Sequence, residues 1–205
     1  MKSIAFMSQK GGSGKTTLAV HTAVAALESG ERVVIVDTDM QKSALTWREA
    51  RAHDTPIVVA VAAIELDQVL RAAQGDGMSL AIVDTAPHAA PDAVRVAKAV
   101  DLVVIPCRPS AFDIAAIGHM IEIVQAAGVP GVIVLSACPF RSPEIGETRA
   151  LLADYGLPVA PVVITDRRAF ARAVATGRAV TEFEGDGKAA AEIRSFWTWL
   201  KGVMP

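Results

Sequence analysis

The sequence predicts an α/β domain in which a mostly parallel β-sheet carries helices on both faces. Short runs of β-branched and other apolar residues alternate with Ala-rich stretches along the chain, and this alternation is typical of parallel sheets. The runs are apolar at nearly every position, as expected of strands that are covered on both faces. The chain has 205 residues, an ordinary size for one domain, so we expect residues 1–205 to form a single domain.

The elements follow in order from this alternation. Runs rich in Val and Ile predict strands at 4–8, 32–37, 57–61, 80–84, 102–106, 132–136 and 159–164. The Ala-rich stretches between and after them predict helices at 15–29, 43–53, 65–74, 91–99, 114–127, 143–155, 167–176 and 188–203. The strand rhythm stops after residue 165, where we expect two helices that pack on the same core.

The composition excludes several classes of protein. A chain that is 52% hydrophobic and 20% charged is not disordered. Its two cysteines, Cys107 and Cys138, exclude a disulfide framework and suit small buried side chains in a reducing cytoplasm. No apolar run approaches the ~20 residues of a membrane span. The net charge is −2, so any binding to nucleic acid needs a local basic patch.

The segment after the first expected strand reads QKGGSGKTT and opens the first expected helix. Glycines let several backbone N–H groups turn toward one anion, and the helix N-terminus adds its dipole. Lys15 can then reach the β- and γ-phosphates of a nucleotide, and the Thr16 hydroxyl can ligate Mg²⁺. These features predict a P-loop NTPase fold, with a phosphate-binding loop made of Lys10, Gly11, Gly12, Ser13, Gly14, Lys15, Thr16 and Thr17.

The loop departs from the ordinary pattern G-x-x-x-x-G-K-[ST], because Gln9 stands where glycine is expected. It fits K-G-G-x-G-K-[ST] instead, with a second lysine at Lys10. This resembles the deviant Walker A motif of the ParA/MinD group of ATPases, and the chain looks most similar to the small plasmid-partition (ParA/ParF-like) members. The resemblance implies that Lys10 crosses a homodimer interface to the nucleotide of the other subunit. The alternative is that Lys10 is an ordinary solvated lysine.

Aspartates end two further expected strands. Asp37 and Asp39 close the run VVIVDTD, and Asp84 closes LAIVD, at the edge where open α/β sheets bind ligands. Asp84 is typical of a Walker B strand, whose carboxylate holds Mg²⁺, often through water. By the resemblance, Asp39 positions the attacking water and Asp37 supports the Mg²⁺ site. The alternative is that these carboxylates cap the helices that follow.

The resemblance also implies that ATP and Mg²⁺ are the cofactors and that hydrolysis is weak without a partner. Many relatives read adenine through an Asn after the strand that corresponds to 132–136. This stretch continues here as Ser136, Ala137 and Cys138, and the chain contains no asparagine. We therefore expect base contacts from backbone groups near Pro139 or within 161–165.

A basic cluster lies late in the chain. It contains Arg167, Arg168, Arg172 and Arg178, with Asp166 as the only acid in that window, for a local charge of about +3. On a helix, Arg168 and Arg172 share one face. By resemblance to partition ATPases, we expect this patch to bind nonspecific DNA of the nucleoid through its phosphates. The alternative is a solvated helix face.

The last expected helix distinguishes two branches of the family. Ile193, Phe196, Trp197 and Leu200 follow an i, i+3, i+4, i+7 spacing with few basic residues nearby. We therefore expect core packing and not the membrane anchor of MinD-like relatives. The predicted function is a cytoplasmic ATPase that partitions or positions a plasmid, a chromosome or a protein assembly, with a ParB-like or other adaptor. A MinD-like membrane-associated ATPase and a nucleotide switch with negligible turnover are the alternatives.

Overall fold

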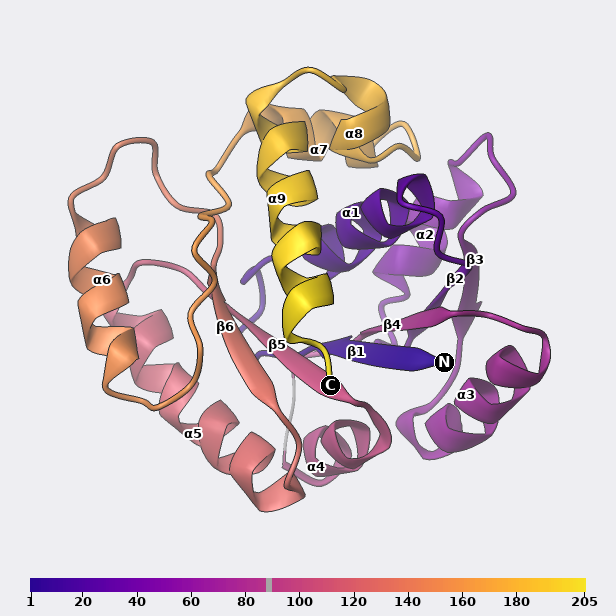
Figure 1. Ribbon diagram of the computed structural model, residues 1–205, viewed down its shortest axis with the longest axis horizontal. Coiled ribbons are helices and arrows are strands. Elements are labelled where there is room, and N and C mark those ends of the chain that lie inside the picture. Colours follow the sequence, from indigo (N-terminus) through magenta and orange to yellow (C-terminus); the bar gives the residue numbers. More distant parts are fainter. Residues whose placement is uncertain (88–89) are drawn as a thin grey trace.

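The computed structural model describes residues 1–87 and 90–205, and within them six strands form one sheet in the order β3-β2-β4-β1-β5-β6 (Figure 1). Every neighbouring pair is parallel, as the uniformly apolar runs predict. β1 lies inside the sheet, between β4 and β5, so the loop after it leaves from the middle of the carboxyl edge. The strands are β1 (Lys2–Phe6), β2 (Val33–Asp37), β3 (Ile57–Ala60), β4 (Leu80–Asp84), β5 (Leu102–Cys107) and β6 (Gly131–Leu135).

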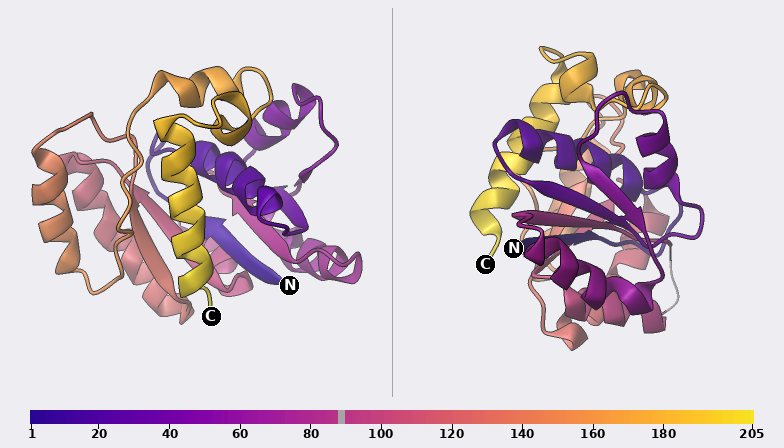
Figure 2. Two further views of the ribbon diagram at one scale, coloured as in Figure 1. Left: turned by 45° about the horizontal axis from the view of Figure 1, so that its top comes forward. Right: turned by 90° about the vertical axis from the view of Figure 1, so that its right-hand side faces the viewer.

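Helices cover both faces of the sheet, so the predicted fold class is confirmed (Figure 2). One face carries α1 (Lys15–Glu28), α2 (Ser43–Glu49), α7 (Arg168–Val174), α8 (Val180–Phe183) and α9 (Lys188–Val203). The other carries α3 (Leu66–Gly75), α4 (Ala90–Ala99), α5 (Ala111–Ala127) and α6 (Glu144–Ala153), with the short 3-10 helix η1 (Ala63–Glu65) before α3.

Helix α1 packs small side chains against the sheet. Ala19, Ala23 and Ala26 are fully buried, and alanine combines a high helix propensity with the least bulk between helix and sheet. The imidazole of His21 is also fully buried and accepts the backbone N–H of Val180 on its Nδ1 at 3.1 Å. This hydrogen bond joins the helix that follows the glycine-rich loop to the start of α8.

The apolar face of α9 packs on the core, as the spacing predicts. Ile193, Phe196 and Leu200 are fully buried, and the Trp197 indole donates its N–H to the Ser29 hydroxyl at 2.7 Å. α1 and α8 lie against this helix. Within the described ranges, no helix is both long enough and apolar enough to cross a membrane.

The prediction of a strand at 159–164 is wrong. Among the described residues, this segment has, in place of a ladder, one isolated parallel bridge, between Val159 and Ile133 of β6, and Thr165 just after it bridges Cys138. Pro161 has no N–H to donate to a ladder. The Arg149 guanidinium also donates to the carbonyl of Pro161 at 3.3 Å and to the preceding carbonyl at 2.8 Å. The segment therefore lies beside β6 without extending the sheet.

The region after residue 165 contains three described helices where the sequence predicts two. Helix α8 spans four residues, too few to show a helical periodicity. The segment that follows α2 holds α8 and the turn before it. Arg51 pairs with both carboxylate oxygens of Glu182 in α8 at 2.8 and 2.6 Å and donates to the Gly177 carbonyl in the turn at 2.9 Å. The Trp47 indole N–H of α2 also donates to the Arg178 carbonyl at 3.2 Å. These contacts tie α2 to the segment that joins α7 to α8.

Candidate functional site

Strand register brings the predicted site residues to one edge of the sheet. Phe6, the last residue of β1, lies beside Asp84 at the end of β4, and Asp84 lies beside Asp37 at the end of β2. The glycine-rich loop begins at Lys10, four residues after Phe6. Two aspartates that are distant in the sequence therefore stand next to the predicted phosphate-binding loop.

The loop has the backbone geometry of an anion site. Gly12 and Gly14 adopt positive φ angles of 71° and 94°, a region that glycine enters without steric cost. Gly14 is the N-cap of α1, and in the described structure no side chain caps this end and no acidic residue occupies the first turn. The first-turn N–H groups are left for an outside acceptor, and the helix dipole favours an anion there.

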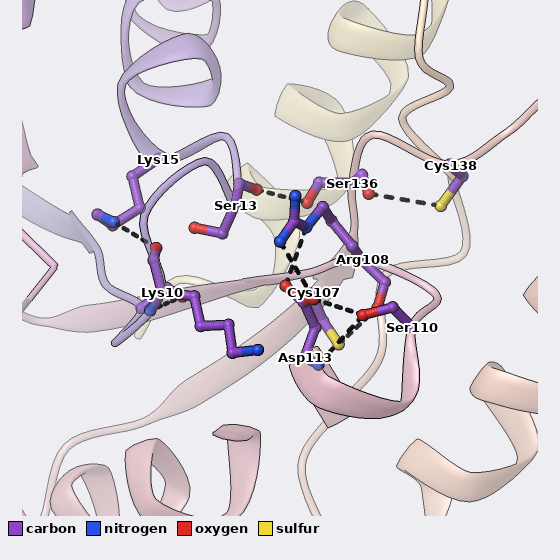
Figure 3. Close-up of polar contacts among 10 residues, drawn as sticks. Lys10, Ser13, Lys15, Cys107, Arg108, Ser110, Asp113, Ser136 and Cys138 are labelled. Atoms are coloured by element: carbon purple, nitrogen blue, oxygen red, sulfur yellow. Dashed lines mark hydrogen bonds and ion pairs between the residues drawn. The ribbon is translucent and has the colours of Figure 1, made fainter. Parts of the chain in front are cut away.

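Lys15 lies inside the loop. Its side chain is buried, with an exposed fraction of 6%, and its Nζ donates to the Lys10 carbonyl at 3.1 Å (Figure 3). Burial lowers the pKa of Lys15, while the nearby carboxylates of Asp84 and Asp39 act in the opposite direction. The ammonium group is thus enclosed by the loop, at the point where phosphate charge has to be compensated.

Asp84 is fully buried, and neither of its carboxylate oxygens has a hydrogen-bond partner among the described residues. Burial raises the pKa of Asp84 to about 7, although the nearby Thr16 hydroxyl and the charge of Lys15 act against the rise. An unsatisfied buried carboxylate is costly, and a hydrated divalent cation would satisfy it. Asp84 and Thr16 therefore fit the predicted Mg²⁺ site, where waters and phosphate oxygens supply most other ligands.

Asp37, which ends β2, and Asp39, two residues later, make different hydrogen bonds. Asp37 accepts the N–H groups of Ala44 and Leu45 on Oδ2 at 3.0 and 3.2 Å, and that of Asp39 on Oδ1 at 3.0 Å. It therefore holds the first turn of α2, which is the capping alternative, and its support of Mg²⁺ stays a prediction. The Asp39 side chain accepts the N–H of Gln41 at 2.9 Å. Asp39 is less enclosed than Asp37, because it lines an open cavity.

Two cavities flank the loop. The first has a volume of about 510 Å³, within the range of ligand sites, and the second of about 490 Å³. The first is lined by Gly12, Gly14 and Thr17 of the loop region, by Ser136 and Ala137 after β6, and by residues 164–167. It includes part of the segment from which we predict base contacts. The second is lined by Ser8, by Asp39 and its neighbours 38–41, and by Thr85, Ala86 and Pro87.

The four predicted DNA-binding arginines do not form one uniform patch. Arg168 and Arg172 lie on the exposed face of α7, and Arg178 is exposed in the turn before α8. Arg167 is different, because its guanidinium donates to Glu192 of α9 at 2.6 and 3.1 Å and lines the first cavity. The fold thus presents three of the arginines at the surface and ties the fourth to α9.

A second basic cluster has no counterpart in the sequence-based predictions. The ring of Phe140 is 59% exposed, and three cations surround it. The Arg141 guanidinium lies 5.0 Å from the ring centre, and Arg167 and Lys188 each lie 5.9 Å away. These cations come from separate segments, so no local run of charge marks them. The only signal in the sequence is an aromatic residue in the polar loop after a buried strand.

Cys107 and Cys138 are buried, and burial raises the pKa of each thiol to about 12. A thiol binds metals as the thiolate, so these side chains behave as the small buried groups that the sequence predicts. In the part of the chain that is described, no group of three or more His, Cys, Asp and Glu side chains is arranged to hold a metal ion.

Comparison with known proteins identifies the family of the chain. The model of the CobQ/CobB/MinD/ParA nucleotide binding domain matches residues 4–180. The chain is 33% identical over 196 residues to maintenance of carboxysome distribution protein A of Gloeobacter kilaueensis, a match that covers 92% of this chain and 88% of that protein.

Solved structures share the fold. Apo McdA from Cyanothece has a TM-score of 0.83 at 17% identity, over 98% of this chain and 99% of that one. The septum site-determining protein MinD from Pyrococcus horikoshii, complexed with Mg-ADP, has a TM-score of 0.81 at 16% identity, over 97% and 95%. The predicted P-loop NTPase fold is confirmed. The family match accounts for the resemblance in the phosphate loop: the chain belongs to the CobQ/CobB/MinD/ParA nucleotide binding domain family.

Proposed function

We propose that this chain is a partition or positioning ATPase, in which Mg-ATP drives formation of a sandwich homodimer and slow hydrolysis dissolves it. The observation that carries the proposal is the pair of lysines in one loop. Lys15 is buried within the loop, whereas the Lys10 ammonium lies outside it, 5.2 Å from the centre of the exposed Phe112 ring. A cation inside the loop suits the subunit's own nucleotide, and a cation outside it suits a nucleotide held by a second subunit.

The proposed chemistry uses the loop and the carboxylates beside it. Backbone N–H groups of residues 11–17 surround the phosphates, and Lys15 compensates for their charge. Thr16 and Asp84 are the residues that would hold Mg²⁺, which when bound would supply positive charge to compensate the phosphates. Asp39 orients the attacking water and accepts its proton, a role that suits a carboxylate at the wall of an open cavity.

We also propose that the dimer binds duplex DNA without sequence preference. The net charge of −2 repels a duplex on average, so binding has to come from a patch. Arg168, Arg172 and Arg178 supply exposed cations, with Arg167 at the edge of the patch. Dimerisation doubles this patch on one rigid body, which makes DNA affinity depend on ATP without any new type of contact.

The proposed cargo is a plasmid, a chromosome or a protein assembly, linked to the ATPase by a ParB-like or other adaptor protein. Similarity to a carboxysome distribution protein supports a protein assembly as one such cargo. In this proposal residues 1–205 act as one domain, in the cytoplasm and on the nucleoid. The burial of the apolar face of α9 favours this function over a MinD-like membrane anchor.

Oligomeric state tests the role of Lys10. Size-exclusion chromatography with light scattering should show a monomer with ADP and a dimer with ATP and Mg²⁺. Lys10→Ala should remove the dimer and leave ADP affinity of the monomer within about twofold, because Lys10 contacts only the partner's nucleotide. Lys98→Ala, which changes an exposed lysine of α4, is the matched control and should dimerise normally. A dimer that persists in Lys10→Ala would contradict this role.

Binding and turnover assays separate the alternatives. Mobility shifts with random and cargo DNA, beside pull-downs with anionic lipid vesicles, are each carried out with ATP and with ADP. We expect ATP-dependent binding to every duplex and none to vesicles. Vesicle binding without DNA binding would support the MinD-like alternative. Phosphate release that stays at background, even with DNA and the adaptor, would support the switch without turnover.

A further inference from the structure

Arg108 lies beside the phosphate loop, although it is far from the loop in the sequence. It follows the last residue of β5, and β5 pairs with β1. A Cβ placed on Gly12 would lie 3.9 Å from the Arg108 Nη1 atom. The guanidinium therefore faces the backbone of the loop, and Figure 3 shows Ser13 of the loop beside it and Asp113 below it.

The guanidinium is held in one orientation. Asp113, which is 7% exposed, accepts Arg108 Nε on Oδ1 at 3.0 Å and Nη2 on Oδ2 at 3.2 Å. The Ser110 hydroxyl donates to the same carboxylate and caps α5 by accepting the Asp113 N–H at 3.2 Å. Within residues 1–87 and 90–205, Nη1 has no hydrogen-bond partner. The nitrogen that faces the loop is thus the one that keeps its donors free.

Arg108 shares its surroundings with Lys10 and not with the nucleotide cavity of its own subunit. Lys10, Arg108 and Phe112 line a shallow hollow of about 360 Å³. Neither cation lines the two larger cavities that flank the loop. Burial raises the pKa of Asp113, but the hydrogen bonds from Arg108 and Ser110 and the charges of Arg108 and Lys10 outweigh it and lower that pKa overall. Asp113 therefore orients Arg108 through hydrogen bonds and attracts the neighbouring Lys10 through charge alone.

We infer that Arg108 is a second cation that acts across the dimer, donating from Nη1 to a phosphate oxygen of the nucleotide held by the other subunit. Asp113 and Ser110 are positioning residues, because they set the guanidinium and do not touch the nucleotide. This inference rests on the proposed sandwich dimer. It adds a rigid contact to that of the flexible Lys10, since a guanidinium fixed at two nitrogens loses little entropy when the third binds.

The test removes the ion pair as a unit, because Arg108→Gln alone leaves Asp113 buried without its partner and could unfold the loop. The double variant Arg108→Gln/Asp113→Asn should weaken ATP-dependent dimerisation about tenfold or more, the scale of one charge-assisted hydrogen bond. Arg71→Gln/Asp67→Asn, which likewise neutralises one arginine and one aspartate, both exposed on α3, is the charge-matched control and should dimerise as the natural protein does. Unchanged dimerisation in a folded double variant overturns the inference.

A second measurement distinguishes a contact across the dimer from one within the subunit. In a Lys10→Ala background, calorimetry with a non-hydrolysable ATP analogue reports binding to the subunit's own loop. Adding Arg108→Gln/Asp113→Asn should change that affinity less than about twofold, and a tenfold loss overturns the inference. If the natural protein forms no dimer with ATP, the proposed function fails. That result is distinct from a dimer whose stability does not depend on Arg108, which would contradict the inference alone.

Discussion

The phosphate loop and helix α7 both present cations that we assign to phosphate binding, but their charges are set in different ways. In the loop, Lys15 and the backbone donors lie within nine consecutive residues, 9–17, which follow β1 and include the start of α1. In the α7 region, Arg167 pairs with Glu192 and Arg172 pairs with Glu184, both from later segments. A local motif therefore shows its charge in the sequence, whereas the charge of a helix face depends on which carboxylates fold against it.

The largest effect is expected inside the loop. Lys15→Ala removes a buried ammonium that, in the proposed function, makes several charge-assisted hydrogen bonds to phosphate, so ATP and ADP affinity should fall about 10³-fold. Isothermal titration calorimetry measures this loss, with Lys98→Ala as the control at an exposed lysine. Near-normal affinity in Lys15→Ala would contradict the view that a local motif, the loop, carries the phosphate-binding charge by itself.

The next effect separates binding from turnover. Asp39→Ala should lower the rate of ATP hydrolysis by about 10²–10³, the scale of a proton-accepting group. ATP affinity and dimerisation should persist, because the Asp39 side chain contacts only the backbone N–H of Gln41 in the described structure. Single-turnover phosphate release gives the rate. An unchanged rate would move the water-orienting role to Asp37.

A smaller effect is expected on α7, and it tests the other half of the comparison directly. Arg168→Ala/Arg172→Ala should reduce the slope of log DNA affinity against log salt by roughly 3 to 4 in the dimer, since each lost phosphate contact contributes about 0.9. Arg167→Ala should change the slope less, because Glu192 pairs with Arg167 at 2.6 Å in a partly buried contact. The Arg172–Glu184 pair is longer, at 3.4 Å, and exposed, so it leaves Arg172 available to phosphate. Fluorescence anisotropy over a range of salt measures both slopes. Equal changes per arginine would show that the pairing with Glu192 does not matter for DNA.

The smallest effect at neutral pH concerns His21, which links the helix of the loop to α8. Burial lowers the pKa of His21 from 6.5 to about 3. In acid, the His21 side chain is therefore protonated in the unfolded chain but stays neutral in the native state. This group therefore removes stability as pH falls from about 6.5 toward 3, by about 1.4 kcal/mol per pH unit.

The variant His21→Asn isolates this group, because it retains an acceptor for the Val180 N–H and does not titrate. Urea unfolding at pH 7, 6 and 5 should show that the natural protein loses more stability per pH unit than His21→Asn does. Parallel pH dependences in the two proteins would contradict a neutral, buried imidazole at this junction.

The same contrast explains how much of the molecule could be predicted from the sequence. The placement of the loop, Asp39 and Asp84 could be predicted, because each belongs to a short run at the end of a strand. Parallel strands bring their carboxyl ends to the same edge of the sheet. The helix-capping role of Asp37 was foreseen only as an alternative, because it depends on how α2 turns back toward β2. The prediction of a strand at 159–164 was wrong because strand propensity does not take two features into account. Pro161 has no N–H to donate to a ladder, and the Arg149 guanidinium competes for the Pro161 carbonyl.

Features that depend on packing could not be predicted. The local charge of about +3 counts only Asp166, whereas the fold adds Glu184 and Glu192 to the same surface. Arg167 and Lys188 reach the Phe140 ring from distant segments, and Arg108 likewise approaches Gly12 from another part of the chain. No pattern within one window of the sequence encodes such contacts.

The burial of α1 has a consequence for how this sequence can vary. The helix has 14 residues and a length of about 21 Å, and its alanines 19, 23 and 26 leave no room for larger side chains. A substitution such as Ala23→Leu at the middle of the helix would shift the axis that aims the loop's N–H groups. Substitutions at core positions far from the loop are therefore limited by the need to keep its N–H groups aimed at phosphate. This constraint extends along the whole helix.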